Sequence, residues 1–334
     1  MENEIKAVFY GLGPIGQEAA KIALKRGVIP AGAIDIDPAK KGNSISELLG
    51  SESGAEVIIS DDAKAILAAS GANVALHCTS SRLADVKEQL LGCVEAGINV
   101  ISTTEELSYP YHLNAEIAKE IDEAAKKHGV TVLGTGINPG FLMDSMVVKV
   151  LGVCEDVKSV KVGRVVDAGG RREPLQRKVG AGMDVEEFKR RVEAGTLGHA
   201  GSRESVAMIA DALGWKMDRI EQSIEPMVAE RDLKTQFLEV KKGRATGIKQ
   251  IGRGFRNGEE VITLDLRMYV GAEEPHDTIK IDGNPKIENT FKGGVHGDVA
   301  TVAVAVNAIP AVIAAQPGLL TMKDLAHFSC WGKG

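Results

Sequence analysis

Short apolar runs alternate with amphipathic segments through the first 140 residues of the chain. Apolar runs of this length are typical of strands buried in a sheet, whereas the spacing of apolar residues between them is typical of helices. The runs predict strands over 5–10, 30–35, 56–59, 73–78, 98–103 and 130–135. The intervening segments predict helices over 15–26, 61–70, 82–96 and 112–128. This alternation favours an α/β fold with a doubly wound, mostly parallel sheet covered by helices on both faces.

From about residue 141 the pattern predicts longer strands and fewer helices. The strands fall over 157–168 and within 234–283, and the helices over 184–194 and 203–213. The triplet Arg256-Asn257-Gly258 predicts a hairpin turn between 248–255 and 261–270. Asp184 is a suitable N-cap for the helix that follows it. We therefore expect a second, α+β domain built on a mainly antiparallel sheet.

A glycine motif after the first predicted strand is the most informative feature of the sequence. Gly11, Gly13 and Gly16 lie between an apolar strand and an alanine-rich helix, the context of a dinucleotide-binding turn. The first glycine permits the tight turn, the second lets the backbone approach a pyrophosphate, and the third allows strand and helix to pack closely. The helix N-terminus adds N–H groups and a positive dipole end. The predicted cofactor contacts in this turn are Gly11, Gly13, Pro14, Ile15 and Gly16.

An acid at the end of the second predicted strand indicates which dinucleotide is preferred. Asp35 lies 19 positions after Gly16, where a carboxylate accepts a hydrogen bond from the ribose 2′-hydroxyl of NAD. The same carboxylate repels the 2′-phosphate of NADP, and the nearby Lys40 and Lys41 would soften that repulsion. We expect NAD to be preferred, with NADP also used. A glycine turn in some other α/β unit is the alternative.

These patterns divide the chain into three segments. Residues 1–140 are predicted to form a Rossmann dinucleotide-binding domain, and residues 141–295 a substrate-binding α+β domain. The stretch over 297–313 is rich in alanine and valine and predicts a return to helix. We expect the C-terminal segment, 296–334, to pack back on the Rossmann domain.

Composition narrows the class of protein further. The 334 residues carry a formal net charge of -6, with 44% hydrophobic and 4% aromatic residues. This charge argues against a nucleic-acid partner, and no apolar run is long enough to span a membrane. The acidic start is unlike a secretory signal, and the four cysteines are scattered without a CxxC pair. We expect a cytoplasmic protein with reduced thiols and no metal, since the sequence also lacks HExxH.

Two loops after predicted strands carry polar side chains at the edge where such sheets form their crevice. In the first loop, Thr79, Ser80 and Ser81 are candidate contacts for the nicotinamide ribose, and they also suit the capping of the next helix. In the second loop, Glu105 and Glu106 follow the strand over 98–103. One of these carboxylates facing the crevice would hold an ammonium group or act as a base toward water. The alternative is that both acids begin the next helix, whose dipole favours them.

A third loop, over 134–144, is fixed by glycines and a proline. Asn138 in this loop is a candidate for orienting the cofactor carboxamide or the substrate, and a purely structural hinge is the alternative. Phe141 and Met143 follow it and are candidate substrate contacts.

The second domain offers charged and imidazole side chains as further substrate contacts. Arg171, Arg172 and Lys178 lie in one basic segment that suits a carboxylate, because arginine presents a bidentate fork. A solvated charge run is the alternative. His199 and His296 lie in glycine-flanked loops, where each is either a ligand contact or a structural residue.

Taken together, the motifs resemble those of the 2,4-diaminopentanoate dehydrogenases and the related native amine dehydrogenases, whose fold is that of dihydrodipicolinate reductase. The resemblance covers nearly the whole chain and is carried by Tyr-Gly-Leu-Gly-Pro-Ile-Gly, Ala-Ile-Asp-Ile-Asp-Pro, Ser-Thr-Thr-Glu-Glu-Leu and Gly-Ile-Asn-Pro-Gly-Phe-Leu-Met-Asp. The glycine motif is shared by many dehydrogenases, whereas the Glu-Glu-Leu and Asn-Pro-Gly-Phe segments are more specific. In the family a glutamate of the Glu-Glu-Leu loop is the acid/base, which implies Glu105 or Glu106, with Glu105 nearer the strand end. The resemblance also implies a homodimer joined through the sheet of the second domain.

The family activity implies the reaction that we expect. It oxidises the C4 amine of 2,4-diaminopentanoate to a ketone with release of ammonia, in the reverse sense of a reductive amination. Two other readings stay open. One is a cyclic imine reductase of the dihydrodipicolinate reductase type, although the paired histidine of those enzymes is absent. The other is a non-catalytic NAD-binding redox sensor.

Overall fold

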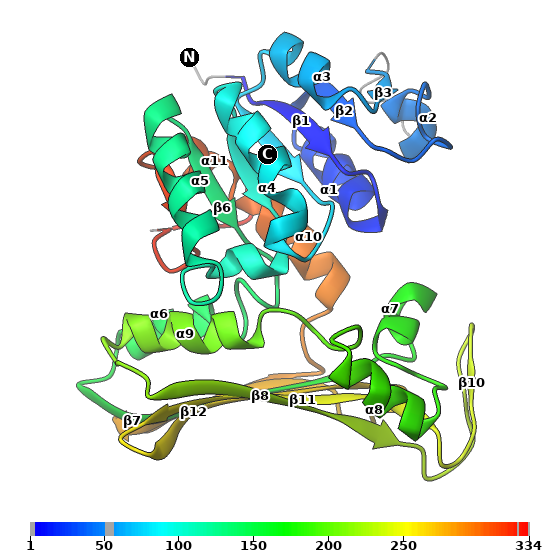
Figure 1. Cartoon of the computed structure of the whole chain (residues 1–334), viewed down its shortest axis with the longest axis vertical. Coiled ribbons are helices and arrows are strands. Elements are labelled where there is room, and N and C mark those ends of the chain that lie inside the picture. Colours follow the sequence, from blue (N-terminus) through cyan, green and yellow to red (C-terminus); the bar gives the residue numbers. More distant parts are fainter. Residues whose placement is uncertain (1–3, 51–56, 326, 333–334) are drawn as a thin grey trace. The chain divides into compact units, whose positions relative to one another are not determined.

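The structure is a computed structural model that describes residues 4–50, 57–325 and 327–332. The chain divides into two compact units (Figure 1). The first unit combines Met1–Phe141 with Gly297–Gly334, and the second is Leu142–His296.

Within the described residues, the first unit is built on a seven-stranded, all-parallel sheet in the order β15-β6-β5-β4-β1-β2-β3. Its strands are β1 (Lys6–Tyr10), β2 (Ile29–Ile34), β3 (Ile59–Ser60), β4 (Val74–His77), β5 (Asn99–Ser102), β6 (Thr131–Gly134) and β15 (Gly318–Leu320). Its helices are α1 (Pro14–Lys25), α2 (Ile45–Leu49), α3 (Ala63–Ser70), α4 (Leu83–Glu95), the 3₁₀ turn η1 (Glu105–Ser108), α5 (Ala115–His128), α10 (Gly297–Asn307) and α11 (Ile309–Ile313). The predicted doubly wound parallel sheet is confirmed.

Alternating residues of β1 show how the sheet is covered on both faces. Ala7 and Phe9 pack in one apolar cluster with residues of α1, α10 and α11. Val8 and Tyr10 pack in a second cluster with residues of α3, α4 and α5. Every residue of β1 after Lys6 is therefore buried, as expected for a strand in the middle of a parallel sheet.

The predicted elements of this unit agree with the structure within a few residues. The strand predicted over 56–59 is the exception, because β3 begins at Ile59 and residue 56 lies outside the described residues. The short elements α2, η1 and β15 were not predicted. Each has only three to five residues, too few to display a helical or strand period.

The second unit is built on a six-stranded mixed sheet in the order β14-β13-β7-β12-β11-β8, as far as the chain is described. Its strands are β7 (Asp156–Asp167), β8 (Arg219–Val228), β9 (Leu233–Lys234), β10 (Glu239–Val240), β11 (Ala245–Arg256), β12 (Glu259–Tyr269), β13 (His276–Asn284) and β14 (Ile287–Lys292), of which β9 and β10 form a separate pair. Its helices are α6 (Ser145–Leu151), α7 (Glu173–Lys178), α8 (Val185–Glu193) and α9 (Ser202–Ala212). Only β7 and β12 pair in parallel, so the predicted, mainly antiparallel sheet is confirmed.

One face of this sheet carries the core of the second unit. Ile262, Leu264 and Leu266 of β12 are buried in an apolar cluster with residues of α6, α8 and α9, which lie over that face (Figure 1). The predicted hairpin turn is present, with Asn257 and Gly258 both at positive φ, as a two-residue turn requires. The helices α6 and α7 and the strands β8 and β14 were not predicted.

Asp184 caps α8, as predicted, by accepting a hydrogen bond from the N–H of Glu186. The four cysteines are free. Burial raises the pKa of Cys78 to about 11 and that of Cys93 to about 12, so both thiols stay protonated at neutral pH. In the described part of the chain, no helix combines the length and the apolar character needed to cross a membrane.

Candidate active site

The glycine turn follows β1 at the point where the sheet order reverses. In the sheet, β1 lies between β2 and β4. The chain runs outward from β1 through α1 and α2 to the edge strand β3, returns through α3 to β4, and continues in the other direction through α4 and α5. Ligands of doubly wound sheets bind outside the carboxyl ends of the strands at such a switch point. The residues that follow β1, β2, β4 and β5 therefore make up the candidate site.

The three glycines of the turn have different steric surroundings. Gly11 has a φ of +86°, and a Cβ there would lie 2.6 Å from the carbonyl oxygen of Cys78. A Cβ at Gly16 would overlap the carbonyl oxygen of Gly11. At Gly13, by contrast, no heavy atom of the described chain other than those of Gly13 and its two chain neighbours lies within 4 Å of the place that a Cβ would take. The turn is thus closed on its protein side and open at Gly13, which fits a pyrophosphate that approaches the backbone there.

The start of α1 supplies the amides for such a phosphate group. Gly13 is the N-cap and makes no side-chain cap, and Pro14 occupies the first turn, where its missing N–H costs nothing. The N–H groups of Ile15 and Gly16 belong to the first turn of the helix, which has no intrahelical partner for them. The residues present therefore fit the dinucleotide predicted from the glycine motif.

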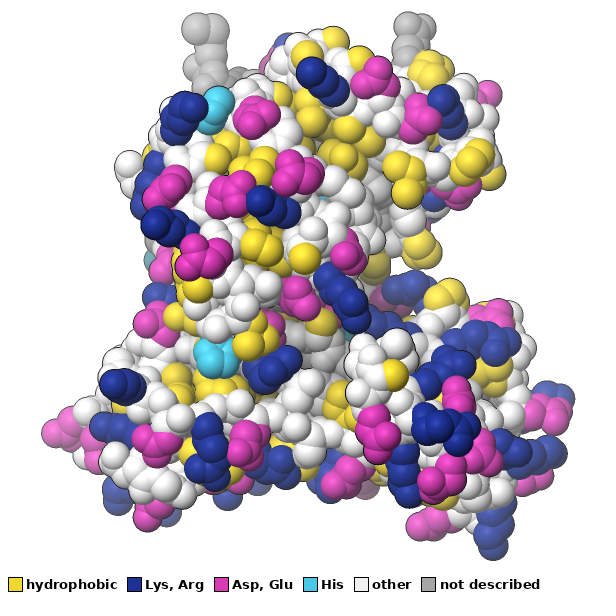
Figure 2. Space-filling view, in the orientation of Figure 1, with side chains coloured by type: hydrophobic (Ala, Val, Ile, Leu, Met, Phe, Trp, Pro, Cys, Tyr) yellow, Lys and Arg dark blue, Asp and Glu magenta, His cyan; other side chains and the backbone are white. Residues whose placement is uncertain are grey.

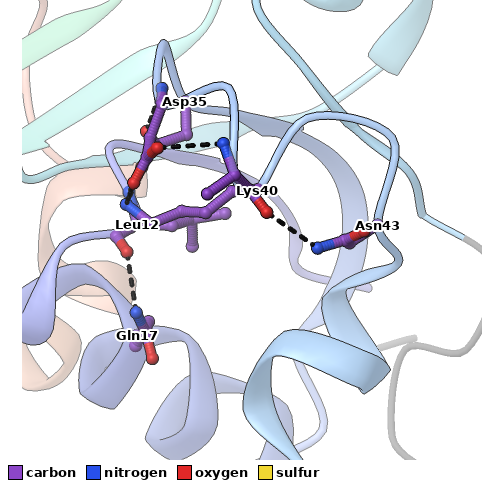
Figure 3. A network of polar contacts seen from close by, with 7 residues as sticks. Leu12, Gln17, Asp35, Lys40 and Asn43 are labelled. Atoms are coloured by element: carbon purple, nitrogen blue, oxygen red, sulfur yellow. Dashed lines mark hydrogen bonds and ion pairs between the residues drawn. The ribbon is translucent and has the colours of Figure 1, made fainter.

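Asp35 is bound to the glycine turn itself (Figure 3). Its Oδ2 accepts from the N–H of Leu12 at 2.7 Å and from Nζ of Lys40 at 3.0 Å, and its Oδ1 accepts from the N–H of Asp37 at 2.9 Å. The side chain of Gln17 donates to the carbonyl of Leu12 from the other side of the turn. Burial raises the pKa of Asp35, but these hydrogen bonds and the Lys40 charge outweigh it and hold that pKa below its usual value. Asp35 is therefore ionised and fixed.

The two lysines expected near Asp35 have different partners. Lys40 reaches both Asp35 and Asp37, whereas Lys41 pairs with Asp61 at 2.7 Å. The turn after Asp37 explains the difference, because it directs consecutive side chains to different sides. Only Lys40 lies beside the acid that would contact the ribose.

The loop after β4 and the loop after β5 are joined by hydrogen bonds. The N–H of Thr103 donates to the carbonyl of His77, Oγ1 of Thr104 donates to the carbonyl of Ser80, and the N–H of Glu106 donates to the carbonyl of Ser81. Thr79, Ser80 and Ser81 thus lie against the residues that flank Glu105. The two loops predicted to serve the site form one structure.

The two adjacent glutamates of the acid loop, residues 103–108, have different surroundings. Oε2 of Glu106 accepts from the N–H of Leu83 at 2.8 Å and so caps the first turn of α4, which has no cap from its own N-cap residue. Oε2 of Glu105 is buried within the loop. Both acids lie in the short turn η1 and not at the start of the next predicted helix, α5, which begins at Ala115. Glu106 caps α4, which precedes it in the chain.

The acid loop packs closely against a glycine on the neighbouring strand. Gly134 ends β6, and a Cβ there would overlap the carbonyl group of Leu107. The hydroxyls of Ser108 and Thr135 beside it are buried and have no hydrogen-bond partner among the described residues. Any side chain at position 134 would push η1 away from the sheet.

The third predicted loop has a constrained backbone. The bond between Asn138 and Pro139 is cis, and Gly140 has a φ of +118°. Asn138 is half-buried. Phe141 packs edge-on against Phe328, with ring centroids 5.6 Å apart, so the end of the chain supports this loop within the first unit.

The predicted contacts of the second unit are spread over several elements. Arg171 is buried, Arg172 is the N-cap of α7, and Lys178 is exposed at the end of that helix. Basic and acidic side chains are intermingled over α7 and α8 in Figure 2, as in the pair Arg177–Glu173. That mixture is typical of a solvated surface, which leaves the buried Arg171 as the member of the run that differs from it.

The remaining predicted contacts of this unit differ in burial. Met143 is 2% exposed and belongs to the hydrophobic core. His199 is held by Gln250, which accepts from its N–H, and its Nδ1 lies 2.8 Å from the carbonyl of Ala200. His296 is exposed.

Several residues of the candidate site were not predicted from the sequence. His77 and Gln89 lie behind the Thr79 loop, and Gly134 supports the acid loop. Outside this site, the second unit holds a buried ion pair of Arg164 and Asp277 that binds the backbone of Val295 and was not predicted either. No motif marks these residues, because their partners are distant in the sequence.

Two sequence comparisons give the family of the chain. The family model described as 2,4-diaminopentanoate dehydrogenase C-terminal domain matches residues 141–333. A 2,4-diaminopentanoate dehydrogenase of Acetoanaerobium sticklandii is 37% identical over 336 residues, which cover 97% of this chain and 94% of that protein.

Solved structures agree with this result. An amine dehydrogenase from Mycobacterium smegmatis superposes with a TM-score of 0.88 and 27% identity, over 99% of this chain and 98% of that one. A dihydrodipicolinate reductase from Paenisporosarcina sp. TG-14, with dipicolinate bound, has a TM-score of 0.56 and 12% identity, over 97% of this chain and 100% of that one, and shows the fold alone. The resemblance seen in the motifs is confirmed: the chain belongs to the 2,4-diaminopentanoate dehydrogenase family of NAD(P)-using amine dehydrogenases.

Proposed function

We propose that this protein oxidises the C4 amine of 2,4-diaminopentanoate to give 2-amino-4-oxopentanoate and ammonia, with Glu105 as the acid/base. The observation that carries the proposal is the pair of contacts on either side of Glu105. Thr104 and Glu106 both bind the loop over 80–83, so the backbone of Glu105 is fixed at the carboxyl end of β5. The switch point of the sheet lies one strand away.

The reaction consumes one protonated amine, one oxidised cofactor and one water, and yields ketone, ammonium, reduced cofactor and one proton. The bound nicotinamide supplies the acceptor for the hydride that leaves C4 of the substrate. Glu105 stabilises the positive charge that develops on the substrate nitrogen as that hydride departs. Its carboxylate then accepts a proton from the water that attacks C4, and returns a proton to the nitrogen as ammonia leaves. The acid loop over 103–108 holds this carboxylate in position before the reaction begins.

Glu106 has a structural part in this proposal. Its carboxylate is engaged with the N–H of Leu83 at 2.8 Å, so it anchors the acid loop to α4. A glutamine at this position keeps an oxygen for that contact, whereas a glutamine at Glu105 removes the proton acceptor. This gives a matched pair of variants on adjacent residues.

The cofactor is proposed to be NAD, with NADP accepted. Asp35 presents a fixed carboxylate at the end of β2, which suits the 2′-hydroxyl of NAD. Lys40 lies 3.0 Å from that carboxylate and offsets its charge, which lowers the repulsion of a 2′-phosphate. Arg171, Arg172 and Lys178 stay candidates for the substrate carboxylate, and the homodimer stays a prediction that light scattering of the purified protein would test.

The decisive experiment is NADH formation at alkaline pH with 2,4-diaminopentanoate, beside a simple amine such as cyclohexylamine. The wild type and Glu106→Gln should turn over the diamino acid, whereas Glu105→Gln should lose about a hundredfold or more of kcat. NADH binding, followed by its fluorescence, should be the same in all three proteins. Equal loss in both variants would contradict the division of roles between the glutamates. Turnover of the simple amine alone would contradict the substrate, and binding of NADH without any turnover would favour a sensor or an imine reductase.

A further inference from the structure

His77, the last residue of β4, is a buried polar side chain that the proposed reaction does not use. It is fully buried, and its ring meets the ring of Tyr10 edge-on with centroids 5.2 Å apart. Its Nδ1 lies 2.9 Å from Oγ of Ser102, and its Nε2 lies 2.8 Å from Oε1 of Gln89 and 3.1 Å from Oγ1 of Thr79. Both ring nitrogens therefore have partners, and the partners come from different elements.

Each ring nitrogen lies within hydrogen-bond distance of a polar partner, Nδ1 of Ser102 and Nε2 of Gln89. The donor and acceptor roles follow the tautomer of the ring, because Oγ of Ser102 also donates to Oγ1 of Thr104 at 2.9 Å. Burial lowers the pKa of His77 to about 4, against the smaller opposing effect of Gln89, so the ring is neutral at the pH of the reaction. A neutral ring with one donor and one acceptor links two different polar partners without a net charge in the core.

From Nδ1, hydrogen bonds lead to the acid loop. Oγ of Ser102 accepts from the N–H of Thr104 at 3.1 Å, and Oγ1 of Thr104 donates to the carbonyl of Ser80 at 2.8 Å. Thr104 directly precedes Glu105. The Nδ1 side of His77 is therefore two hydrogen bonds away from the backbone that carries the proposed acid/base.

From Nε2, hydrogen bonds lead to the first loop and to the glycine turn. Oγ1 of Thr79 donates to Oε1 of Gln89 at 2.9 Å, so Thr79, Gln89 and His77 form a closed triangle. The methyl group of Thr79 lies where it would clash with any Cβ on Gly11, at 2.7 Å. The Nε2 side thus fixes the wall against which the dinucleotide turn packs.

We propose that His77 is a positioning residue that holds the acid loop in register with the Thr79 loop and the glycine turn. Its two ring nitrogens serve two separate arms, the Nδ1 arm for Glu105 and the Nε2 arm for the nucleotide turn. The catalytic part of this inference rests on the proposed function, whereas the mechanical part rests on the hydrogen bonds alone.

The two arms are separated by two amide substitutions. In His77→Asn, the side-chain oxygen takes the place of Nδ1, so the contact with Ser102 is kept and that with Gln89 is lost. In His77→Gln, the side-chain nitrogen takes the place of Nε2, so the contact with Gln89 is kept and that with Ser102 is lost. Ser102→Ala and Thr79→Val are smaller changes that break the same arms one at a time, and they guard against a His77 variant that fails to fold.

The test combines amide hydrogen exchange with steady-state kinetics on the full chain. Relative to wild type, His77→Gln and Ser102→Ala should exchange faster over residues 103–108 and lose about tenfold or more in kcat, with NADH affinity within about threefold. His77→Asn and Thr79→Val should exchange at the wild-type rate over residues 103–108 and bind NADH about fivefold or more weakly. Exchange in the hairpin of β11 and β12 is the internal control and should not change in any variant.

The outcomes separate this inference from the proposed function. If the wild type turns over no amine, the exchange pattern and NADH affinities still test the two arms. Equal effects of His77→Asn and His77→Gln on loop exchange and on kinetics would overturn the proposal. So would variants that lower only the melting temperature, because His77 would then be a core residue without a positioning role.

Discussion

Two neighbouring parts of the candidate site are held in opposite ways. The glycine turn over 11–16 is hydrogen-bonded to Asp35 and Gln17, but its close packing requires the absence of side chains, because a Cβ on Gly11 or Gly16 would overlap backbone atoms. The acid loop over 103–108 is fixed by side chains, through Thr104, Glu106 and the Ser102–His77 pair. The first part should therefore fail when atoms are added, and the second when polar atoms are removed.

The largest effect is expected from adding one carbon to the glycine turn. In Gly16→Ala the new Cβ would overlap the carbonyl oxygen of Gly11, which is backbone and has no room to move. We expect the free energy of unfolding to fall by about 4 kcal/mol, measured by urea denaturation. In Gly13→Ala the Cβ meets open space, so stability should change by about 1 kcal/mol or less while NADH binding weakens. Equal stability of the two variants would contradict the steric account.

The second effect is a pH dependence of stability that originates at His77. Its pKa falls from 6.5 to about 4 on folding, so the unfolded state binds more protons between these values. The His77 contribution is therefore present above pH 6.5 and decreases by about 3 kcal/mol as the pH falls to 4. Urea unfolding at pH 7, 5.5 and 4.5 should show a flatter profile for His77→Asn than for the wild type. Parallel profiles of the two proteins would mean that folding does not lower the pKa of His77.

A smaller effect is expected where Glu106 caps α4. Glu106→Ala removes the acceptor for the N–H of Leu83 and should lower the free energy of unfolding by about 1 kcal/mol. Glu106→Gln keeps an acceptor oxygen and should lose less than half of that amount, as measured in the same urea experiment. If Glu106→Gln lost as much free energy of unfolding as Glu106→Ala, the charge of Glu106, rather than its hydrogen bond, would stabilise the helix.

The smallest effect tests the ion pair of Lys40 and Asp35 beside the glycine turn. Lys40→Met removes the charge beside Asp35 but leaves the hydrogen bonds from Leu12 and Asp37. The preference for NAD over NADP, as a ratio of kcat/KM values, should rise about fivefold. Lys41→Met is the control, because Lys41 pairs with Asp61, and its ratio should be unchanged. A fall in the ratio with Lys40→Met would mean that Lys40 is not a determinant of cofactor choice.

The sequence predicted most of the fold because buried strands and helices carry their own periods. Five of the six predicted strands of the first unit, all but the one over 56–59, and the hairpin at Asn257 were readable for that reason. The strand β15 was not, because three residues contain no period and its partner β6 lies far away in the chain. The strand also forms at an edge that only the folded chain defines.

The candidate site was predictable in its residue types and much less in its connections. The residues next to Glu106 in the sequence do not indicate that its side chain binds α4, because its partner, Leu83, is 23 residues away. The same limit applies to His77 and Ser102, which are 25 residues apart and carry no motif. Lys40 and Lys41 were indistinguishable until the turn after Asp37 directed them to different acids. Long-range side-chain contacts are set by packing, which a local pattern does not record.

The order in which the ribosome makes this chain has a consequence for how the first unit matures. Residues of α10 and α11, among them Val302, Val306 and Val312, cover the sheet face that carries Ala7 and Phe9. They are synthesised only after the whole second unit, which is Leu142–His296. During synthesis α1 covers part of that face, but the part that packs on α10 and α11 stays exposed while the second unit is made. We therefore expect a nascent chain that stalls before residue 312 to expose apolar surface of the kind that chaperones bind.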